Sequence, residues 1–251
     1  MMQSTTTFVS KTIRQGDLLA GRVAEASALA GVFGFFSRCL EEEVDLAFAE
    51  RIRGELRQPL KAFGLIFDEE FYAVPAESLV ETLDEEYTGL FVAPGSVSPY
   101  ASVFETGCMF KEPADRALTA YRQAGWDYKR RLSGEFPDHI GTMLGFYAIL
   151  AEAESESLTV ADISRADGYK TQRNRFLDEQ LGPWGPGWCR RAAEAALHPF
   201  YEKLLQILEQ ALWAELVQIV DRRRLRELVE LNQRRPKHLD YDADFRKASG
   251  L

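Results

Sequence analysis

The chain has 251 residues, of which 46% are hydrophobic, and this composition supports a packed core and excludes a disordered protein. Its net charge of -9 at pH 7 would repel phosphate groups, so it disfavours nucleic acid and suits a cationic partner. The three cysteines, Cys39, Cys108 and Cys189, form no CxxC pair, and none adjoins a histidine. We therefore expect reduced thiols, without a disulfide framework or a zinc site. We also expect no bound cofactor.

The first notable segment is an apolar stretch over residues 26–37, bounded by Glu25 and Arg38. It is too short to span a bilayer and lies too far into the chain for a secretion signal. The N-terminal residues also carry no twin-arginine motif. We expect a cytoplasmic protein that is not stably inserted in a membrane.

Helical periodicity dominates the rest of the chain. Apolar residues recur three or four positions apart in the segments 79–91, 118–132, 140–150 and 197–220. A proline precedes each of the first three segments, where it suits the first turn of a helix. No series of alternating apolar and polar residues indicates strands. The pattern predicts an all-α fold.

Three segments between these helices are predicted to be irregular. Residues 93–99 and 182–188 are rich in proline, which lacks an amide donor, and in glycine, which adds backbone entropy. Both are therefore predicted to be loops. The polar stretch 152–166 is predicted to be a connection with some helical content.

The C-terminal part begins with a highly charged helix over 221–235, which carries a thin apolar stripe. This helix suits either a partner-docking arm or a peripheral element with solvated arginines, and we favour the second interpretation. We expect one helical domain over residues 1–235, with a hinge near 133–137. A tail over 236–251 follows.

Motifs of the common enzyme classes are absent. There is no glycine-rich phosphate loop, no dinucleotide turn, no HExxH zinc motif and no GxSxG nucleophile elbow. The three histidines, His139, His198 and His238, lie too far apart in the sequence to form a metal-binding pattern. A catalytic triad can assemble in space, but no residue pattern recommends one. We expect binding without turnover.

The segment Glu-Phe-Pro-Asp-His at 135–139 is the most informative for function. With Pro137 in the first turn of a helix, Asp138 would lie at the helix N-terminus, where free amides favour its charged form. Its carboxylate would then accept paired hydrogen bonds from an arginine, and His139 would add a hydrogen bond that changes near neutral pH. Ordinary helix-start chemistry explains the same residues and is favoured on physical grounds alone. A catalytic Asp-His pair is the third interpretation.

This segment, with the apolar helix after it, resembles the signature of the TorD/DmsD family of redox-enzyme maturation chaperones. Residues 87–104 resemble the family's tyrosine and Leu-Phe pair, its Gly/Pro loop, and the aromatic residue and Ser-Val pair that follow. Residues 176–184 are similar to its Leu-x-Pro-Trp region, and 198–201 to the start of its last core helix. The motifs occur in the family's order over roughly 84–210.

The resemblance implies an all-α chaperone without a metal. Such a chaperone binds the twin-arginine signal peptide of a molybdopterin oxidoreductase precursor and delays export until the cofactor is inserted. Two guanidinium groups followed by an apolar helix suit carboxylates beside an aromatic groove. The family's recognition residues correspond to Pro137, Asp138, His139, Tyr87, Phe91, Tyr100 and Ser102, and Trp126 is added by proximity. Some relatives form domain-swapped dimers, so a monomer and a swapped dimer are both expected alternatives.

Other interpretations stay open at this point. Tyr87 and Phe91 also fit the core stripe of their helix, and Ser102 fits a helix or turn cap. The closest alternative function is a NarJ-like assembly chaperone for a nitrate-reductase-like subunit, although Asp138, His139 and the loop 94–102 favour TorD/DmsD. A nucleotide hydrolase and an interaction scaffold are alternatives from other classes. The missing phosphate loop counts against the hydrolase.

Overall fold

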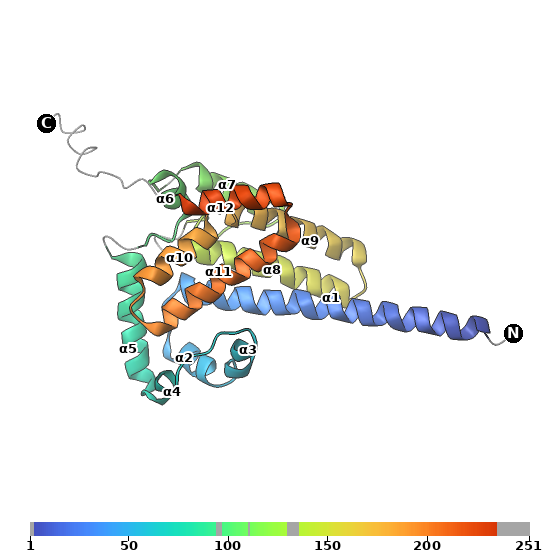
Figure 1. Ribbon diagram of the computed structural model, residues 1–251, viewed down its shortest axis with the longest axis horizontal. Helices are drawn as coiled ribbons and strands as arrows, with labels where there is room; N and C mark the ends of the chain where they lie inside the picture. Colours follow the sequence, from blue (N-terminus) through green and yellow to red (C-terminus); the bar gives the residue numbers. More distant parts are fainter. Residues whose placement is uncertain (1–2, 94–96, 110, 130–135, 235–251) are drawn as a thin grey trace.

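The protein is built of helices that meet around a shared apolar core (Figure 1). The computed structural model describes residues 3–93, 97–109, 111–129 and 136–234, with side chains from residue 16 onward. The elements are α1 (Gln3–Glu41), α2 (Leu46–Arg53), α3 (Arg57–Ala62), α4 (Glu69–Ala73), α5 (Ala76–Tyr87), the π-helical turn η1 (Thr88–Val92), α6 (Ala101–Thr106), α7 (Glu112–Gln123), α8 (Ile140–Thr159), α9 (Ile163–Phe176), the π-helical turn η2 (Leu177–Leu181), α10 (Gly185–Ala195), α11 (Pro199–Ile219) and α12 (Arg222–Gln233). No strand occurs among these residues, and the all-α prediction is confirmed.

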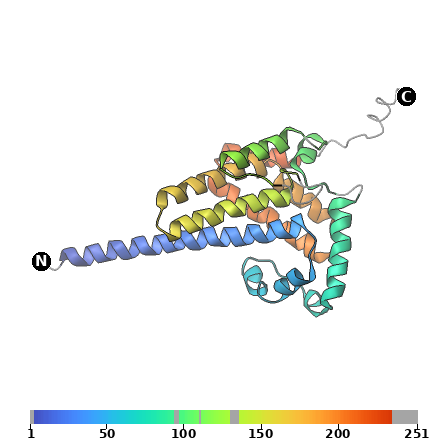
Figure 2. The same ribbon diagram turned by 180° about the vertical axis from the view of Figure 1, so that it is seen from behind.

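Helices α1 and α8 lie side by side and antiparallel (Figure 2). The start of α8 meets the end of α1, and further along, the Ser155 hydroxyl donates a hydrogen bond to the Val23 carbonyl at 3.3 Å. A Cβ atom at Gly141 would lie 2.6 Å from Cγ of Glu41, and one at Gly145 would lie 2.7 Å from Oγ of Ser37. Glycine is required at Gly141, because a Cβ atom there would also meet the backbone nitrogen of Glu41 at 2.8 Å and push the helices apart. At Gly145 the Ser37 hydroxyl would have to rotate away.

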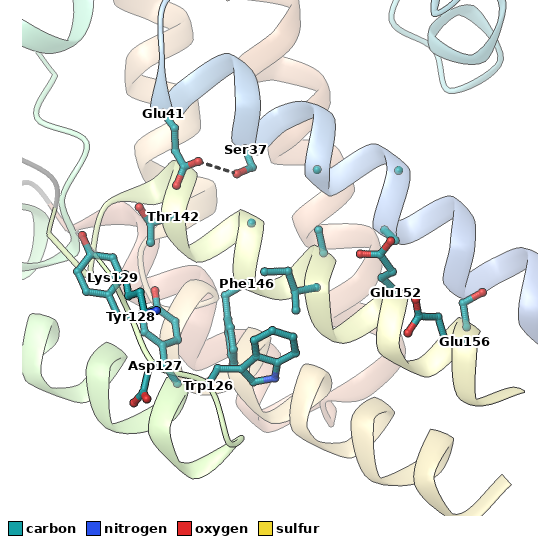
Figure 3. Close-up of a pocket in the computed structure, with 18 of the residues that line it drawn as sticks. Ser37, Glu41, Trp126, Asp127, Tyr128, Lys129, Thr142, Phe146, Glu152 and Glu156 are labelled. Atoms are coloured by element: carbon teal, nitrogen blue, oxygen red, sulfur yellow. Dashed lines mark hydrogen bonds between the residues drawn. The ribbon is translucent and has the colours of Figure 1, made fainter. Parts of the chain in front are cut away.

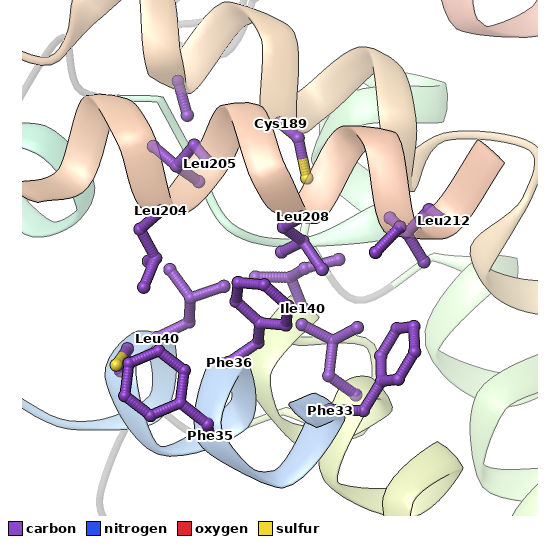
Figure 4. Close-up of a cluster of buried hydrophobic side chains, with 14 of the residues drawn as sticks. Phe33, Phe35, Phe36, Leu40, Ile140, Cys189, Leu204, Leu205, Leu208 and Leu212 are labelled. Carbon is purple, nitrogen blue, oxygen red and sulfur yellow. The ribbon is translucent and has the colours of Figure 1, made fainter. Parts of the chain in front are cut away.

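The core forms where α1, α8, α10 and α11 converge (Figure 4). Its central side chains are each no more than 1% exposed: Phe33, Phe36, Leu40, Ile140, Cys189, Leu204, Leu208 and Leu212. Burying one such leucine or phenylalanine contributes roughly 1.5–3 kcal/mol. The packing of these four helices therefore stabilises the fold and fixes the relative positions of α1 and α8.

The N-terminal part of α1 extends beyond the other helices (Figures 1 and 2). Leu18 in this part is 71% exposed, whereas Phe33 and Phe36 are buried in the core. The apolar stretch predicted at 26–37 is thus one section of a longer helix. By length and composition alone, Gly16–Glu41 is the one helix in the described chain that could cross a membrane. Its C-terminal half, however, serves as a core helix.

The helix predicted over 118–132 is too long. The observed helix α7 ends at Gln123, and Gly125 adopts a φ of 84°, a left-handed conformation that glycine accepts readily. The Trp126 amide then donates to the Tyr121 carbonyl at 3.0 Å, and residues 126–129 run on without helical structure. Residues 130–132 lie outside the described residues. This early end of α7 positions Trp126 and the residues after it.

The connection predicted over 152–166 is also wrong. Helix α8 continues to Thr159, and only residues 160–162 separate it from α9. The cause is tertiary, because Glu154 and Ser157 face the protein interior despite their polar character. Glu154 is held there by Arg173 of α9 at 3.2 Å.

The loop predicted over 182–188 forms a turn only at residues 182–184, because α10 already begins at Gly185. Pro186 suits this position, since the first turn of a helix needs no amide donor. A Cβ atom at Gly187 would lie 2.4 Å from the carbonyl oxygen of Asn232, so glycine admits the charged helix α12 here. The side chain of Asn232 accepts a hydrogen bond from the Gly187 amide and donates to the Gly182 carbonyl. The charged helix is therefore anchored by a buried amide.

Three further predictions fall wholly or partly on residues that the structure does not describe. Residues 94–96 of the first loop lie outside it, as do 133–135 of the expected hinge and the whole tail over 236–251. The division into one domain and a tail stays a prediction.

Candidate functional site

The predicted recognition residues around Asp138 lie together where the loop before α6 meets the turn before α8. The Asp138 carboxylate accepts a hydrogen bond from the Ser102 amide at 2.8 Å, and its backbone carbonyl accepts one from the Ala101 amide. Asp138 therefore caps the first turn of α6, a helix distant in sequence. The side chain is only 1% exposed. The expectation of a reachable carboxylate at the start of the next helix is wrong.

His139 caps α8, which begins three residues later than predicted. Its Nδ1 accepts a hydrogen bond from the Gly141 amide at 3.2 Å, and its ring packs edge-on against Tyr100 at 5.2 Å. Pro137 precedes the helix, and its carbonyl accepts a hydrogen bond from the Tyr121 hydroxyl at 2.5 Å. These residues hold two loops and α7 in register. They form a structural junction, hereafter the Asp138 junction.

Ser102 does not cap a helix. It is the second residue of α6, and the Asp138 carboxylate satisfies its amide. The Ser102 hydroxyl is buried and has no hydrogen-bond partner in the described chain.

Tyr87 and Phe91 lie in the core. The Tyr87 hydroxyl donates to the Leu40 carbonyl at 3.1 Å, and the Phe91 ring stacks on Trp188 at 5.7 Å. Burial raises the pKa of Tyr87 well above its ordinary value, so the phenol remains a hydrogen-bond donor. The core interpretation of both side chains agrees with this geometry.

A groove of about 830 Å³ runs between α1, α8 and the segment 126–129 (Figure 3). Small residues of α1 leave it open along one wall, among them Ala30, Gly31 and Gly34. Phe146 and Ile149 of α8 form its apolar floor with Trp126, which is 38% exposed. Of the eight residues predicted to bind a ligand, only Trp126 lines this groove.

Carboxylates stand at both ends of the groove. Glu41 and Asp127 lie towards the start of α8, together with Lys129, while Glu152 and Glu156 lie towards its end (Figure 3). Lys129 is the one basic side chain among the described lining residues. The groove therefore combines an apolar floor with an excess of negative charge.

Tyr121 connects the groove with the Asp138 junction. It lines the groove, and its ring packs on Phe146 at 4.6 Å while its hydroxyl holds Pro137. Burial raises the pKa of Tyr121, and the charges of Asp138 and Glu41 add to this effect. The phenol consequently keeps its proton for the hydrogen bond. The junction thus fixes one wall of the groove without contacting its interior.

The sequence did carry a signal for the missed residues of the groove. Gly145, Ile149, Glu152 and Glu156 are spaced by four, three and four residues, the spacing of one helix face. The apolar pattern of that helix ends at residue 150, so the two glutamates fall within the predicted connection over 152–166.

Comparison with known protein families identifies the family of this chain. The model of the family described as nitrate reductase delta subunit matches residues 49–190, more than half of the chain. The chain belongs to the nitrate reductase delta subunit family. This match confirms the predicted resemblance to the broader TorD/DmsD/NarJ superfamily, and it spans α8 but not α1.

Two curated relatives are each named Chaperone protein TorD, from strains YJ016 and CMCP6 of Vibrio vulnificus. Each is 28% identical to this nitrate reductase delta subunit family member over 130 residues. The alignment covers 50% of this chain and 59% of each relative. The chain thus spans little more than half the length of the relatives it matches.

This family member also contains a buried ionic network outside the groove. Arg173 of α9 contacts Glu154 at 3.2 Å, and it donates to the Tyr147 hydroxyl at 2.7 Å. Tyr147 in turn donates to Glu215 of α11 at 3.1 Å. The network joins three helices, and it satisfies charges that burial would otherwise disfavour.

The described residues offer little for metal or thiol chemistry. No group of three His, Cys, Asp or Glu side chains among them is placed to hold a metal ion. Burial raises the pKa of the Cys39 and Cys189 thiols, so both stay protonated. The arrangement is suited to binding.

Proposed function

We propose that this protein is a cytoplasmic chaperone that binds the twin-arginine signal peptide of a molybdopterin oxidoreductase precursor in the groove between α1 and α8. Binding would delay export of the precursor and assist cofactor insertion. The observation that carries the proposal is the combination of an apolar, partly aromatic floor with more carboxylates than basic side chains in one open groove. Family membership and the printed name of the TorD relatives support it.

The dimensions and chemistry of the groove match such a ligand. From Thr142 to Glu156, α8 lines it over a rise of fourteen residue steps, or roughly 21 Å at 1.5 Å per step. A signal peptide presents two adjacent guanidinium groups and then an apolar helix. Carboxylates favour the guanidinium groups, and Trp126, Phe146 and Ile149 favour the apolar face.

The residues predicted from the family motifs receive different roles in this proposal. Trp126 contacts the ligand. The other seven position the groove: Pro137, Asp138, His139, Tyr100 and Ser102 through the Asp138 junction, and Tyr87 and Phe91 through the core. The protein acts by non-covalent binding, without a catalytic step, cofactor or metal.

A NarJ-like function is the second candidate, because the matching family is described as nitrate reductase delta subunit. Such a chaperone would serve a catalytic subunit that is never exported. Its ligand would be a cationic, apolar terminal segment without paired arginines.

Isothermal titration calorimetry with twin-arginine signal peptides of the host's molybdoenzymes tests the proposal. Each peptide is compared with its twin-lysine version, which keeps the charge but loses the planar guanidinium fork. We expect one peptide to bind and its lysine version to bind more weakly. If no twin-arginine peptide binds, but the N-terminal segment of a nitrate-reductase-like subunit does, the NarJ-like function replaces the proposal.

A further inference from the structure

Glu152 and Glu156 are the two carboxylates at the end of the groove that no described basic side chain lines. Both are exposed, and neither forms an ion pair or a side-chain hydrogen bond with any described residue. Glu41, at the opposite end, accepts a hydrogen bond from the Ser37 hydroxyl at 3.4 Å, and Lys129 shares that end. Asp127 forms no ion pair with a described residue either, but it lies at the same end as Lys129. The two glutamates therefore form the end of the groove at which no basic side chain among the described lining residues offsets the negative charge.

Folding gives no reason for these two charges. Like charges four residues apart on one helix face repel each other. Glu156 also lies in the last turn of α8, where the helix dipole disfavours an anion. Arg165 of α9 attracts Glu156 at longer range, but the two side chains form no ion pair, and the guanidinium donates to the Tyr169 hydroxyl at 3.2 Å. A cationic ligand would remove the repulsion.

We propose that the two adjacent arginines of the signal peptide dock on Glu152 and Glu156. The apolar helix of the peptide then runs over Ile149, Phe146 and Trp126 towards the start of α8. This inference rests on the proposed function and deepens it by placing the arginines and setting the direction of the peptide. It moves the arginine site away from Asp138.

The geometry of the pair suits paired guanidinium groups. Side chains four residues apart on a helix lie about 5–6 Å apart at their Cβ atoms. Each carboxylate offers two oxygens to a planar fork, so two neighbouring arginines can each engage one glutamate. Figure 3 shows both glutamates at the same end of the groove, beyond Trp126 and Phe146. The apolar part of a bound peptide then meets the apolar floor on the Trp126 side.

The test uses calorimetric titration of the full chain with the signal peptide that binds best. The variant Glu152→Gln/Glu156→Gln is compared with Glu81→Gln/Glu85→Gln, an exposed pair with the same spacing on α5 that does not line the groove. Each variant removes two negative charges, so the long-range attraction between the protein and the cationic peptide falls by a similar amount in both. We expect at least a roughly tenfold rise in Kd for the groove pair and less than about twofold for the control.

A second arm pairs each protein with a peptide in which both arginines are glutamine. If the arginines contact the two glutamates, the peptide change and the groove variant together weaken binding no more than either alone. Additive losses, or equal losses in the two protein variants, would overturn the docking site while leaving the proposed function intact. Absence of binding by any signal peptide to the unmodified protein would overturn both.

Discussion

Glu154 and Glu156 lie two residues apart on α8, but the first is 3% exposed and the second faces an open groove. Glu154 is buried between α8 and α9, where it forms an ion pair with Arg173 at 3.2 Å. The Arg173 guanidinium also donates a hydrogen bond to the Tyr147 hydroxyl. Glu156 and its neighbour Glu152 have no such partner among the described residues. One helix thus presents the same side chain to two environments.

The comparison separates charges that maintain the fold from charges that are free to bind. A buried carboxylate must be paired, because desolvation otherwise costs several kcal/mol. An exposed carboxylate stays hydrated and needs no partner within the protein, so it can pair with a ligand instead. Asp138 belongs with Glu154 in the first class, since the Ser102 amide already uses it.

The largest effect is expected for Arg173→Met. It leaves Glu154 buried without its cation, and the free energy of unfolding should fall by about 3–5 kcal/mol. Denaturant titration followed by circular dichroism measures this. Arg175→Met on the same helix is the control, because its pair with Glu179 is exposed and should contribute less than about 1 kcal/mol. Similar losses in both variants would contradict the division into two classes.

The next effect is expected for Asp138→Ala. It removes the acceptor of the buried Ser102 amide, so the free energy of unfolding should fall by about 1–3 kcal/mol. Asp115→Ala on α7, an exposed position, is the control for the loss of a carboxylate. If Asp138→Ala leaves stability unchanged but abolishes signal-peptide binding, Asp138 belongs to the ligand-binding class and the junction assignment is wrong.

Trp126→Ala should act on binding and not on folding. The ring lines the groove and is 38% exposed, so its loss should raise the Kd for the signal peptide about tenfold with little change in unfolding. Phe63→Ala is the matched control, because Phe63 is 37% exposed but lies outside the groove. Calorimetry on both variants makes the comparison, and equal affinities would remove Trp126 from the site.

The smallest effect concerns His198, a partly buried titratable group. Burial lowers its pKa, outweighing the nearby carboxylates of Glu86, Asp68 and Glu70, and its neutral Nδ1 accepts a hydrogen bond from the Phe200 amide. Because the folded pKa is below the ordinary value, this contribution to stability is present above about pH 6.5 and declines as the pH falls below it.

The substitution His198→Asn tests this pH dependence. Asparagine retains an N-cap acceptor without titrating in this range. Unfolding measured at about pH 7.5 and about pH 5 should therefore show a smaller pH difference in the variant than in the unmodified protein. An unchanged difference would assign the pH dependence to other groups.

Local patterns predicted much of the fold. The apolar spacing before residue 150 identified the core face of α8, and prolines marked the starts of α5 and α7. The same reasoning failed at residues 152–166, because polarity alone does not say whether a glutamate faces solvent or a buried arginine. It also failed at 185–188, where proline and glycine open a helix and admit Asn232.

The candidate site was less predictable than the fold. Residues 137–139 of the predicted motif shape the groove through Tyr121, and of the predicted binding residues only Trp126 lines it. The α1 wall carries no motif, because its contribution is the absence of large side chains at Ala30, Gly31 and Gly34. These small residues line a groove only because α8 packs beside them in the folded protein.

The sequence by itself determined the helical fold, the family and the acidic, apolar character of the chain, because these depend on composition, spacing and local motifs. Tertiary structure decided which carboxylates are buried and paired with other residues of the protein. Whether Asp138, Glu154 or Glu156 is available to a ligand depends on the residues packed against it, and those lie 19 to 36 positions away for the two buried carboxylates. Burial and pairing are properties of that packing, so the location of the site emerged only with the fold.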